Sequence, residues 1–237
     1  LLGGTVAQGA DYIHRMNAEA FKMGETFQRI GVIPEEQRAY VVQFTKQQIA
    51  MGRQMVGQFD ASGSAIKNFV MESEALTRIT GQNREQQQAV LDRAMSEETF
   101  AATVLELTRT NRKGVADQLV YVQKMLGNFS DAVQTGAADM ASNRGLVSQE
   151  AARFNQATMG EYQRFVQRIY AGQYKNEQEL AAGLEQVAQA ANNYYDAAGS
   201  SAAQMKVLGD YSIKQSDYAR FLAISQQGLA KATRLSN

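Results

Sequence analysis

The stretch SEETFAATVLELTRTNRKG, residues 96–114, contains the pattern on which the fold depends. It opens with Ser-Glu-Glu, and the macrodipole of a helix favours such acids in its first turn. Apolar residues then recur at three- and four-residue steps, at Phe100, Val104, Leu105 and Leu107. This spacing places them on one face of an α-helix. Asn111 and Gly114 mark its end, and a further helix is expected from Val115 to Leu126, ending at Gly127.

Toward the N-terminus the same spacing predicts three more helices and the beginning of a fourth. One runs from Tyr12 to Ile30 and stops at Gly31, and Pro34 begins the next, which carries apolar residues from Tyr40 to Phe59. Ser64 is the expected cap of a third helix, which Thr80 and Gly81 end. Asn83, with Gln86 three residues later, predicts a capping box for the helix that follows.

Toward the C-terminus the pattern weakens and then returns. Between residues 128 and 145 glycines lie among small residues with few large apolar ones, so we expect a weakly packed join. Ser148 starts a long helical segment through Tyr170, Asn176 caps one that ends at Gly199, and residues 205–229 form a last one. We therefore expect three regions: helical residues 1–127, the join 128–145 and helical residues 146–237.

These signals predict an all-α fold of multiple short to medium helices in an extended or bundled, oligomeric arrangement. Heptads persist for only two or three turns, which favours short bundles over one long coiled coil. Several glycines fall inside helical patterns, where each costs about 1 kcal/mol relative to alanine. They are Gly24, Gly52, Gly57, Gly160, Gly172, Gly183, Gly209 and Gly228. We expect them to permit bends or close helix contacts; the alternative is a chain built to flex.

The chain contains 27 glutamines among its 237 residues, several of them in clusters. The clusters are Gln47-Gln48, Gln86-Gln87-Gln88 and Gln226-Gln227. Uncharged polar faces can lie against a neighbouring chain at a lower desolvation cost than charged ones. We therefore expect these glutamines on the surface, where they are exposed to solvent or face an assembly.

Composition excludes several classes of function. The 24 basic and 24 acidic residues cancel and alternate along the chain, so we expect no sequence-specific nucleic-acid binding, which needs a basic stripe. The lack of cysteine excludes disulfides and thiolate metal sites. No run of about 18 apolar residues is present, so we expect no transmembrane segment.

Residues for catalysis, metal binding or cofactor binding are scarce. His14 is the only histidine, so no histidine-based metal cluster or Ser-His-Asp triad can form, and we expect it on an exposed helix surface. Three sets of acids are better explained by helix starts and polar faces than by catalysis. They are Glu35-Glu36, Glu72 with Glu74, and Glu97-Glu98. We predict no enzyme, no cofactor and no metal.

Two short motifs could argue for an enzyme, and both are weak. Gly3-Gly4 and Gly9 lack the Gly-Lys-Ser/Thr ending of a phosphate loop. Ser64 and Lys67 match the SxxK pattern of penicillin-recognising enzymes, but the companion KTG motif is missing and Ser64 is already explained as a cap.

A family resemblance is carried by residues 74–86, EALTRITGQNREQ. This stretch resembles the helix, Thr-Gly turn and capped helix that recur in tail tape measure proteins of bacteriophages with contractile tails. Residues 27–36 and 146–152 are similar to the same family. The resemblance covers about half of the chain.

The resemblance implies a structural component of the virion that lies inside the phage tail. Such a protein fills the tail tube, helps set its length and is released during genome delivery. The implied partners are copies of itself, three or six in number, together with tail tube and baseplate hub proteins. No catalysis is implied. The alternative class is a helical bacterial sensory or secretion-associated interaction protein.

The sparse core suggests that copies of the chain complete one another's packing. We expect seven apolar residues to bury part of their surface between chains. They are Phe154, Phe165, Ile169, Leu180, Leu184, Tyr218 and Phe221.

Overall fold

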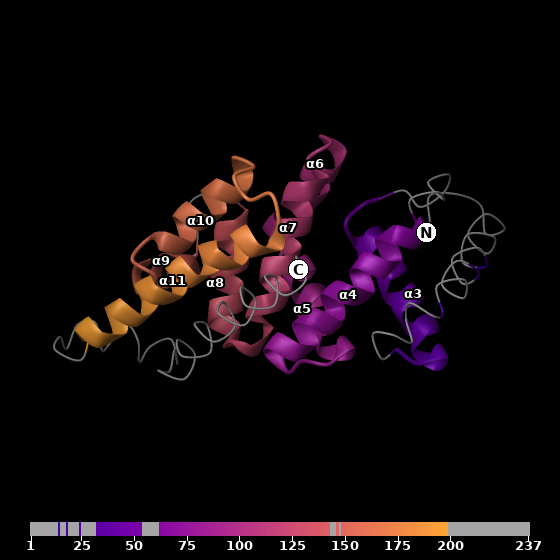
Figure 1. The fold of residues 1–237 in the computed structure, drawn as a ribbon. Coiled ribbons are helices and arrows are strands. Elements are labelled where there is room, and N and C mark those ends of the chain that lie inside the picture. Colours follow the sequence, from indigo (N-terminus) through magenta and orange to yellow (C-terminus); the bar gives the residue numbers. More distant parts are fainter. Residues whose placement is uncertain are drawn as a thin grey trace. The chain divides into compact units, whose positions relative to one another are not determined.

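The computed structural model describes residues 32–53, 62–142, 146 and 148–198, with the single positions 14, 18 and 24. These residues form nine α-helices and one 3-10 helix, and no strand occurs among them (Figure 1). The all-α class is therefore confirmed. The predicted helices 12–30 and 205–229 lie outside the described residues, apart from positions 14, 18 and 24, which are helical. The chain divides into two compact units, Leu1–Arg78 and Ile79–Asn237.

The first unit contains α3 (Pro34–Ala50) and most of α4 (Ser62–Thr80). Pro34 is the first residue of α3 as predicted, and the Glu36 carboxylate accepts a hydrogen bond of 3.3 Å from the Ile33 amide. The prediction that this helix runs on to Phe59 is wrong. It ends at Ala50 because Gly52 adopts a left-handed conformation, with φ of 69°.

Aromatic rings join α3 to α4. The ring of Phe69 in α4 meets the rings of Tyr40 and Phe44 edge-on, with centroids 6.3 Å and 5.5 Å apart. The Tyr40 hydroxyl also donates a hydrogen bond to the Glu74 carboxylate. Edge-to-face aromatic pairs contribute beyond the area that they bury, so these contacts anchor the two helices.

The Thr-Gly turn has the predicted form. α4 ends at Thr80, and Gly81 follows with φ of 72°. The Asn83 side chain accepts a 2.9 Å hydrogen bond from the Gln86 amide, and the Gln86 side chain accepts one of 2.8 Å from the Asn83 amide. This capping box begins α5 (Arg84–Ser96) and is confirmed.

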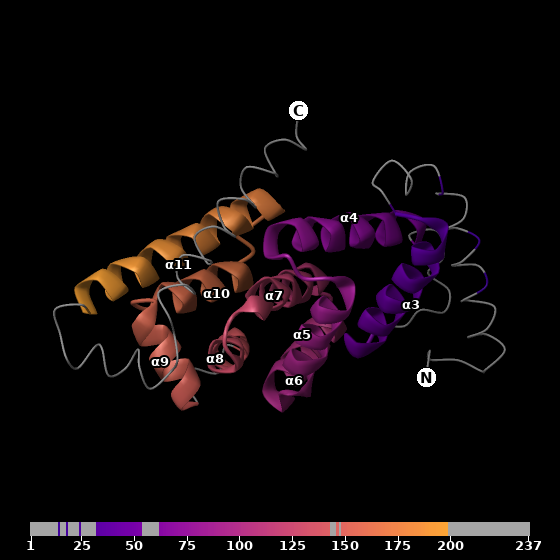
Figure 2. The same ribbon diagram turned by 90° about the horizontal axis from the view of Figure 1, so that it is seen from below.

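The second unit continues from α5 as a bundle of helices. In chain order they are α6 (Glu98–Arg109), α7 (Lys113–Met125), η2 (Leu126–Asn128), α8 (Asp131–Ala141), α9 (Gln149–Ala157), α10 (Glu161–Tyr170) and α11 (Glu177–Ala198). α7 contacts α5, α6, α8 and α10, and α11 lies along α10 and α9 (Figure 2). The rings of Phe154, Tyr162 and Phe165 follow one another with centroids 4.9 Å and 6.0 Å apart, which places an aromatic core under α11.

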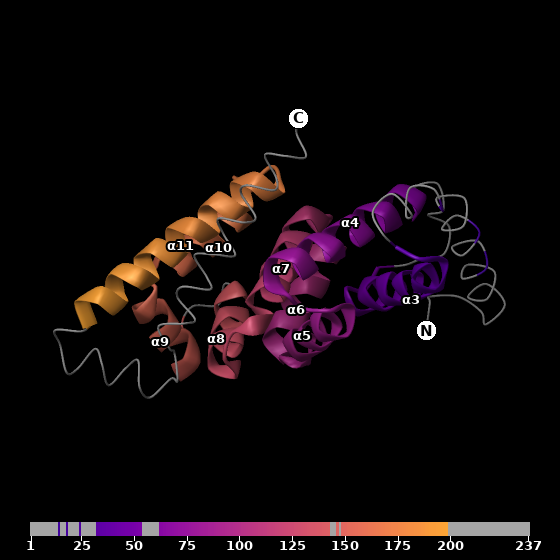
Figure 3. The ribbon, with the colours of Figure 1, turned by 60° about the horizontal axis from the view of Figure 1, so that its bottom comes forward.

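The expectation of a weakly packed join at residues 128–145 is wrong for the residues described there. α8 occupies most of this segment and lies beside α9 (Figure 3), and all of its buried residues except Gln134 and Met140 are small or branched. The small or branched ones are Val133, Gly136, Ala137, Ala138 and Ala141. Small side chains permit the two helix backbones to approach closely, so this segment packs tightly although Phe129 and Met140 are the only large apolar side chains buried in its described part.

The single helical segment predicted from Ser148 to Tyr170 is divided. Ser148 does cap α9, since its hydroxyl accepts a 3.0 Å hydrogen bond from the Ala151 amide. The helix then stops where Met159 and Gly160 adopt left-handed conformations, with φ of 51° and 74°. Asn176 caps α11 as predicted, because its side-chain oxygen accepts from the Glu179 amide at 2.9 Å.

Eight glycines inside the helical patterns were expected to permit bends or close contacts. Most of those that the structure describes lie at helix ends instead. Gly52, Gly160 and Gly172 all have positive φ and lie at helix ends. Gly183 lies within α11 and serves a close contact, since a Cβ there would fall 2.8 Å from the Phe165 ring. Gly24 is helical, and Gly57, Gly209 and Gly228 lie outside the described residues.

Five of the seven residues expected between chains are buried within one chain. Phe154, Phe165, Ile169, Leu180 and Leu184 are all at most 4% exposed, so their assignment to an interface is wrong. Tyr218 and Phe221 lie outside the described residues. The error has a physical cause: helical spacing shows which residues share an apolar face and does not show whether that face meets the same chain or another one.

Candidate functional site

The candidate residues for chemistry are dispersed or have structural roles. His14 is exposed on a helix. Ser64 and Lys67 lie one turn apart near the start of α4, and Lys67 is partly exposed. Because α4 begins at Ser62, the prediction that Ser64 caps this helix is wrong. The described residues contain no group of three or more histidine, cysteine or acidic residues that could hold a metal ion.

The paired acids also occupy helix starts and contacts. Glu36 caps α3, and Glu74 accepts the hydrogen bond from Tyr40. Glu97 is the N-cap residue of α6 and Glu98 its first residue. The positions of Glu36, Glu97 and Glu98 agree with the macrodipole explanation, because these acids lie at helix N-termini. Glu74 lies in the middle of α4 and pairs with the Tyr40 hydroxyl instead.

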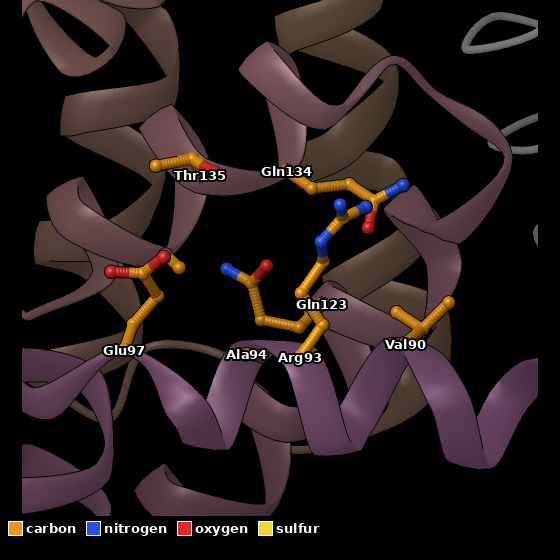
Figure 4. Close-up of a pocket in the computed structure, with 8 residues that line it drawn as sticks. Val90, Arg93, Ala94, Glu97, Gln123, Gln134 and Thr135 are labelled. Carbon is orange, nitrogen blue, oxygen red and sulfur yellow. The ribbon is translucent and has the colours of Figure 1, made fainter.

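A small cavity lies between α5, α7 and α8 in the described part of the chain, and polar side chains are among those that line it (Figure 4). Its lining residues are Val90, Arg93, Ala94, Glu97, Gln123, Gln134, Thr135 and Ala138. Its volume is about 10 Å³. That is room for about one water molecule, whereas pockets for small molecules have volumes of roughly 300–1,000 Å³.

Two buried glutamines give this cavity its chemistry. Gln134 of α8 donates from Nε2 to the carbonyl oxygens of Gly127 at 3.1 Å and Phe129 at 2.8 Å, which ties the turn after α7 to α8. Gln123 of α7 is 1% exposed, its amide points into the cavity, and its Nε2 makes no hydrogen bond within the described residues (Figure 4). The site therefore presents the Nε2 donor of Gln123, which makes no hydrogen bond within the described residues, to a water-sized space that Glu97 also lines.

An ion pair joins α5 and α8 at the edge of this cavity. Arg93 Nη2 donates to Asp131 Oδ2 at 2.7 Å, and Nη1 donates to Oδ1. The hydrogen bond from Arg93 lowers the pKa of the Asp131 carboxyl, and the same bond raises the pKa of Arg93. Both side chains are well exposed, so solvent screens the pair and it orients α8 more than it stabilises the unit.

Comparison with known proteins identifies no family for this chain. No protein family model matches the chain, and no curated protein or solved structure matches it. None of the helices in the described ranges is long and apolar enough to cross a membrane.

The buried glutamines were not predicted from the sequence, although the helical spacing contains a signal for one of them, Gln123. Gln47, Gln48 and Gln87, which were expected on the surface, are buried, whereas Gln86 is exposed. Gln226-Gln227 lies outside the described residues. Gln123 falls four residues after Leu119 on the buried face of α7, so its position in the apolar period marks it as internal.

Proposed function

We propose that this chain is a non-catalytic structural component of a virion, similar to the tail tape measure proteins of contractile-tailed bacteriophages. In this role it lies inside the phage tail, fills the tube and helps to set its length, and it leaves during genome delivery. Its partners are copies of itself, tail tube proteins and baseplate hub proteins.

The local structure of residues 74–86 carries this proposal. The resemblance rests on a helix, a Thr-Gly turn and a capped helix, and these residues form the end of α4, the left-handed Gly81 and the capping box of Asn83. A matching order of local structures supports the resemblance, because it depends on specific residues and not on a general richness in alanine and glutamine.

The packing of the second unit also supports a structural role. Its helices meet through small residues and aromatic rings, and the cavity between α5, α7 and α8 has room only for water. Tight packing of this kind suits a protein whose task is to occupy space and keep its dimensions.

The test is an in-frame deletion of helical residues of this chain from the gene that encodes it, in a phage that carries the gene. We expect electron micrographs to show shorter tails, by at most about 1.5 Å for each deleted residue, the rise of a helix. As the matched control, alanine substitutions of His14, Ser64 and Lys67 should leave tail length and infectivity unchanged.

Two results would contradict the proposal. One is that the tail length stays unchanged after the deletion and that the unmodified protein is absent from purified phage particles. The other is loss of infectivity on substitution of His14, Ser64 or Lys67 in a protein that still folds. Recovery of the protein from the bacterial envelope would instead favour the sensory or secretion-associated class.

A further inference from the structure

The exposed part of α3 is a single narrow line of residues. From Gln37 to Ile49, only Arg38, Ala39, Val42, Lys46 and Ile49 are exposed. Arg38, Val42, Lys46 and Ile49 follow steps of four, four and three residues, which places them along one face of the helix. We name these four residues the basic stripe. Val42 is 50% exposed and Ile49 is 36% exposed, so the stripe presents apolar surface between and beside two cations.

α6 exposes a stripe of opposite charge. Glu98, Ala102 and Glu106 are exposed at steps of four residues, and Arg109 follows them at the end of the helix. We name Glu98, Ala102 and Glu106 the acidic stripe. Its two carboxylates are eight residues apart, as are Arg38 and Lys46, so both charge pairs span about 12 Å along their helices. In each stripe the apolar residue lies midway between the charges.

We propose that the basic stripe of one copy docks on the acidic stripe of a second copy, with the two helices antiparallel. Arg38 then faces Glu106, Lys46 faces Glu98, and Val42 packs on Ala102. The antiparallel direction follows from the ends of the stripes. If the helices were parallel, the apolar Ile49 would face the charged Arg109, whereas in the antiparallel arrangement Ile49 extends beyond Glu98.

The two stripes lie on different helices, so this contact joins unlike surfaces. After one contact forms, the first copy still has its acidic stripe free and the second copy still has its basic stripe free. Further copies can therefore add in the same direction. The inference deepens the proposed function, since it names a surface through which copies inside a tail would meet. Exposed ion pairs are weak and screened by salt, and an interface of this size is small. We therefore expect weak, salt-sensitive association of the free protein and stronger association where copies are confined together.

Charge reversal in the full chain tests this pairing. Sedimentation equilibrium at low salt should show concentration-dependent association of the unmodified protein. The double variants Arg38→Glu/Lys46→Glu and Glu98→Lys/Glu106→Lys should each associate at least about tenfold more weakly, since each then presents two stripes of the same sign. An equimolar mixture of the two variants should associate again, because every stripe finds an opposite one. The variant Lys113→Glu/Lys175→Glu changes the net charge by the same amount as the first variant and should associate normally.

Circular dichroism of each variant checks that the helices are retained. The proposal is overturned if the unmodified protein stays monomeric at all concentrations and salts. It is equally overturned if either reversed variant associates as strongly as the unmodified protein, or if the mixture associates no more strongly than the two variants do alone. Because this experiment uses purified protein, its failure leaves the tail-length experiment as an independent test of the proposed function.

Discussion

A Cβ atom on Gly136 would lie 2.7 Å from the backbone carbonyl oxygen of Glu150. Gly136 is in the middle of α8 and Glu150 is in the first turn of α9, so the glycine marks a close approach of the two helix backbones. The neighbouring atom belongs to the backbone and cannot rotate away as a side chain could. The helix pair therefore depends on the missing side chain at this position.

Replacing Gly136 by alanine should destabilise the second unit. The added methyl group must push α9 away, and overpacking of this kind costs about 1–3 kcal/mol. Urea unfolding followed by circular dichroism measures the change. The control is Gly114→Ala in α7, where a Cβ meets nothing within 4 Å and alanine is the better helix former. Equal stability of the two variants would show that α8 and α9 are farther apart than described.

The capping box at the start of α5 should have a measurable effect on stability. Asn83→Ala removes the acceptor for the Gln86 amide, and the loss of such a cap lowers the free energy of unfolding by about 1 kcal/mol. Ser130, the N-cap residue of α8, makes no side-chain capping hydrogen bond. Ser130→Ala should therefore leave the urea midpoint almost unchanged. A larger loss at Ser130 than at Asn83 would refute this assignment of caps.

The two glutamines of the cavity should respond differently to methionine, which has a similar shape. Gln134→Met removes hydrogen bonds to two carbonyl oxygens and should lower the free energy of unfolding by about 1–3 kcal/mol. Gln123→Met removes a buried Nε2 without a hydrogen bond and should leave the free energy of unfolding unchanged or raise it. Thermal unfolding of both variants gives the comparison. A strong loss at Gln123 would mean that its amide is held by a bound water molecule.

Much of the helical fold follows from the sequence because its signals are local. The caps predicted at Asn83 and Asn176 and the helix start predicted at Ser148 require only residues within one turn, and all three form. Helix ends at Gly52 and Gly160 were harder to predict, since glycine tolerates both helical and left-handed backbone. Which conformation it takes depends on the packing of the helices on either side, and that is not a local property.

Alkaline pH should destabilise the second unit through Tyr162, which is buried, and Tyr170, which is partly buried. Burial raises the pKa of Tyr170 to about 12 and raises the pKa of Tyr162 as well. In the unfolded chain a tyrosine ionises near pH 10. The folded form therefore keeps its protons longer, so its stability is complete below about pH 10 and falls as the pH rises toward about 12.

The measurement is urea unfolding at several pH values, with tyrosinate absorbance as a second signal. Tyr170→Phe should show a shallower loss of stability above about pH 10 than the unmodified protein, although it also lacks the 2.9 Å hydrogen bond to the Ala141 carbonyl. An identical pH dependence for both proteins would contradict the burial of this hydroxyl.

The polar cavity could be predicted only in part. Position in the helical period marks Gln123 as internal, but the partners of Gln134 are carbonyl groups of the turn after α7, which no side-chain pattern reveals. Likewise the period placed Phe165 and Leu184 on apolar faces without showing that these faces meet inside one chain. Pairing between distant segments depends on the whole topology, so it had to come from the structure.

The glutamines in the interior also affect how the protein responds to temperature. Eight are buried among the residues that the structure describes, namely Gln37, Gln43, Gln47, Gln48, Gln82, Gln87, Gln123 and Gln134. Exposure of apolar surface on unfolding raises the heat capacity, whereas exposure of polar surface lowers it. An interior that contains so many amides should therefore have a smaller heat-capacity change of unfolding than an apolar core of equal size. Its stability curve is correspondingly flatter, and the fold weakens only gradually on cooling or on warming.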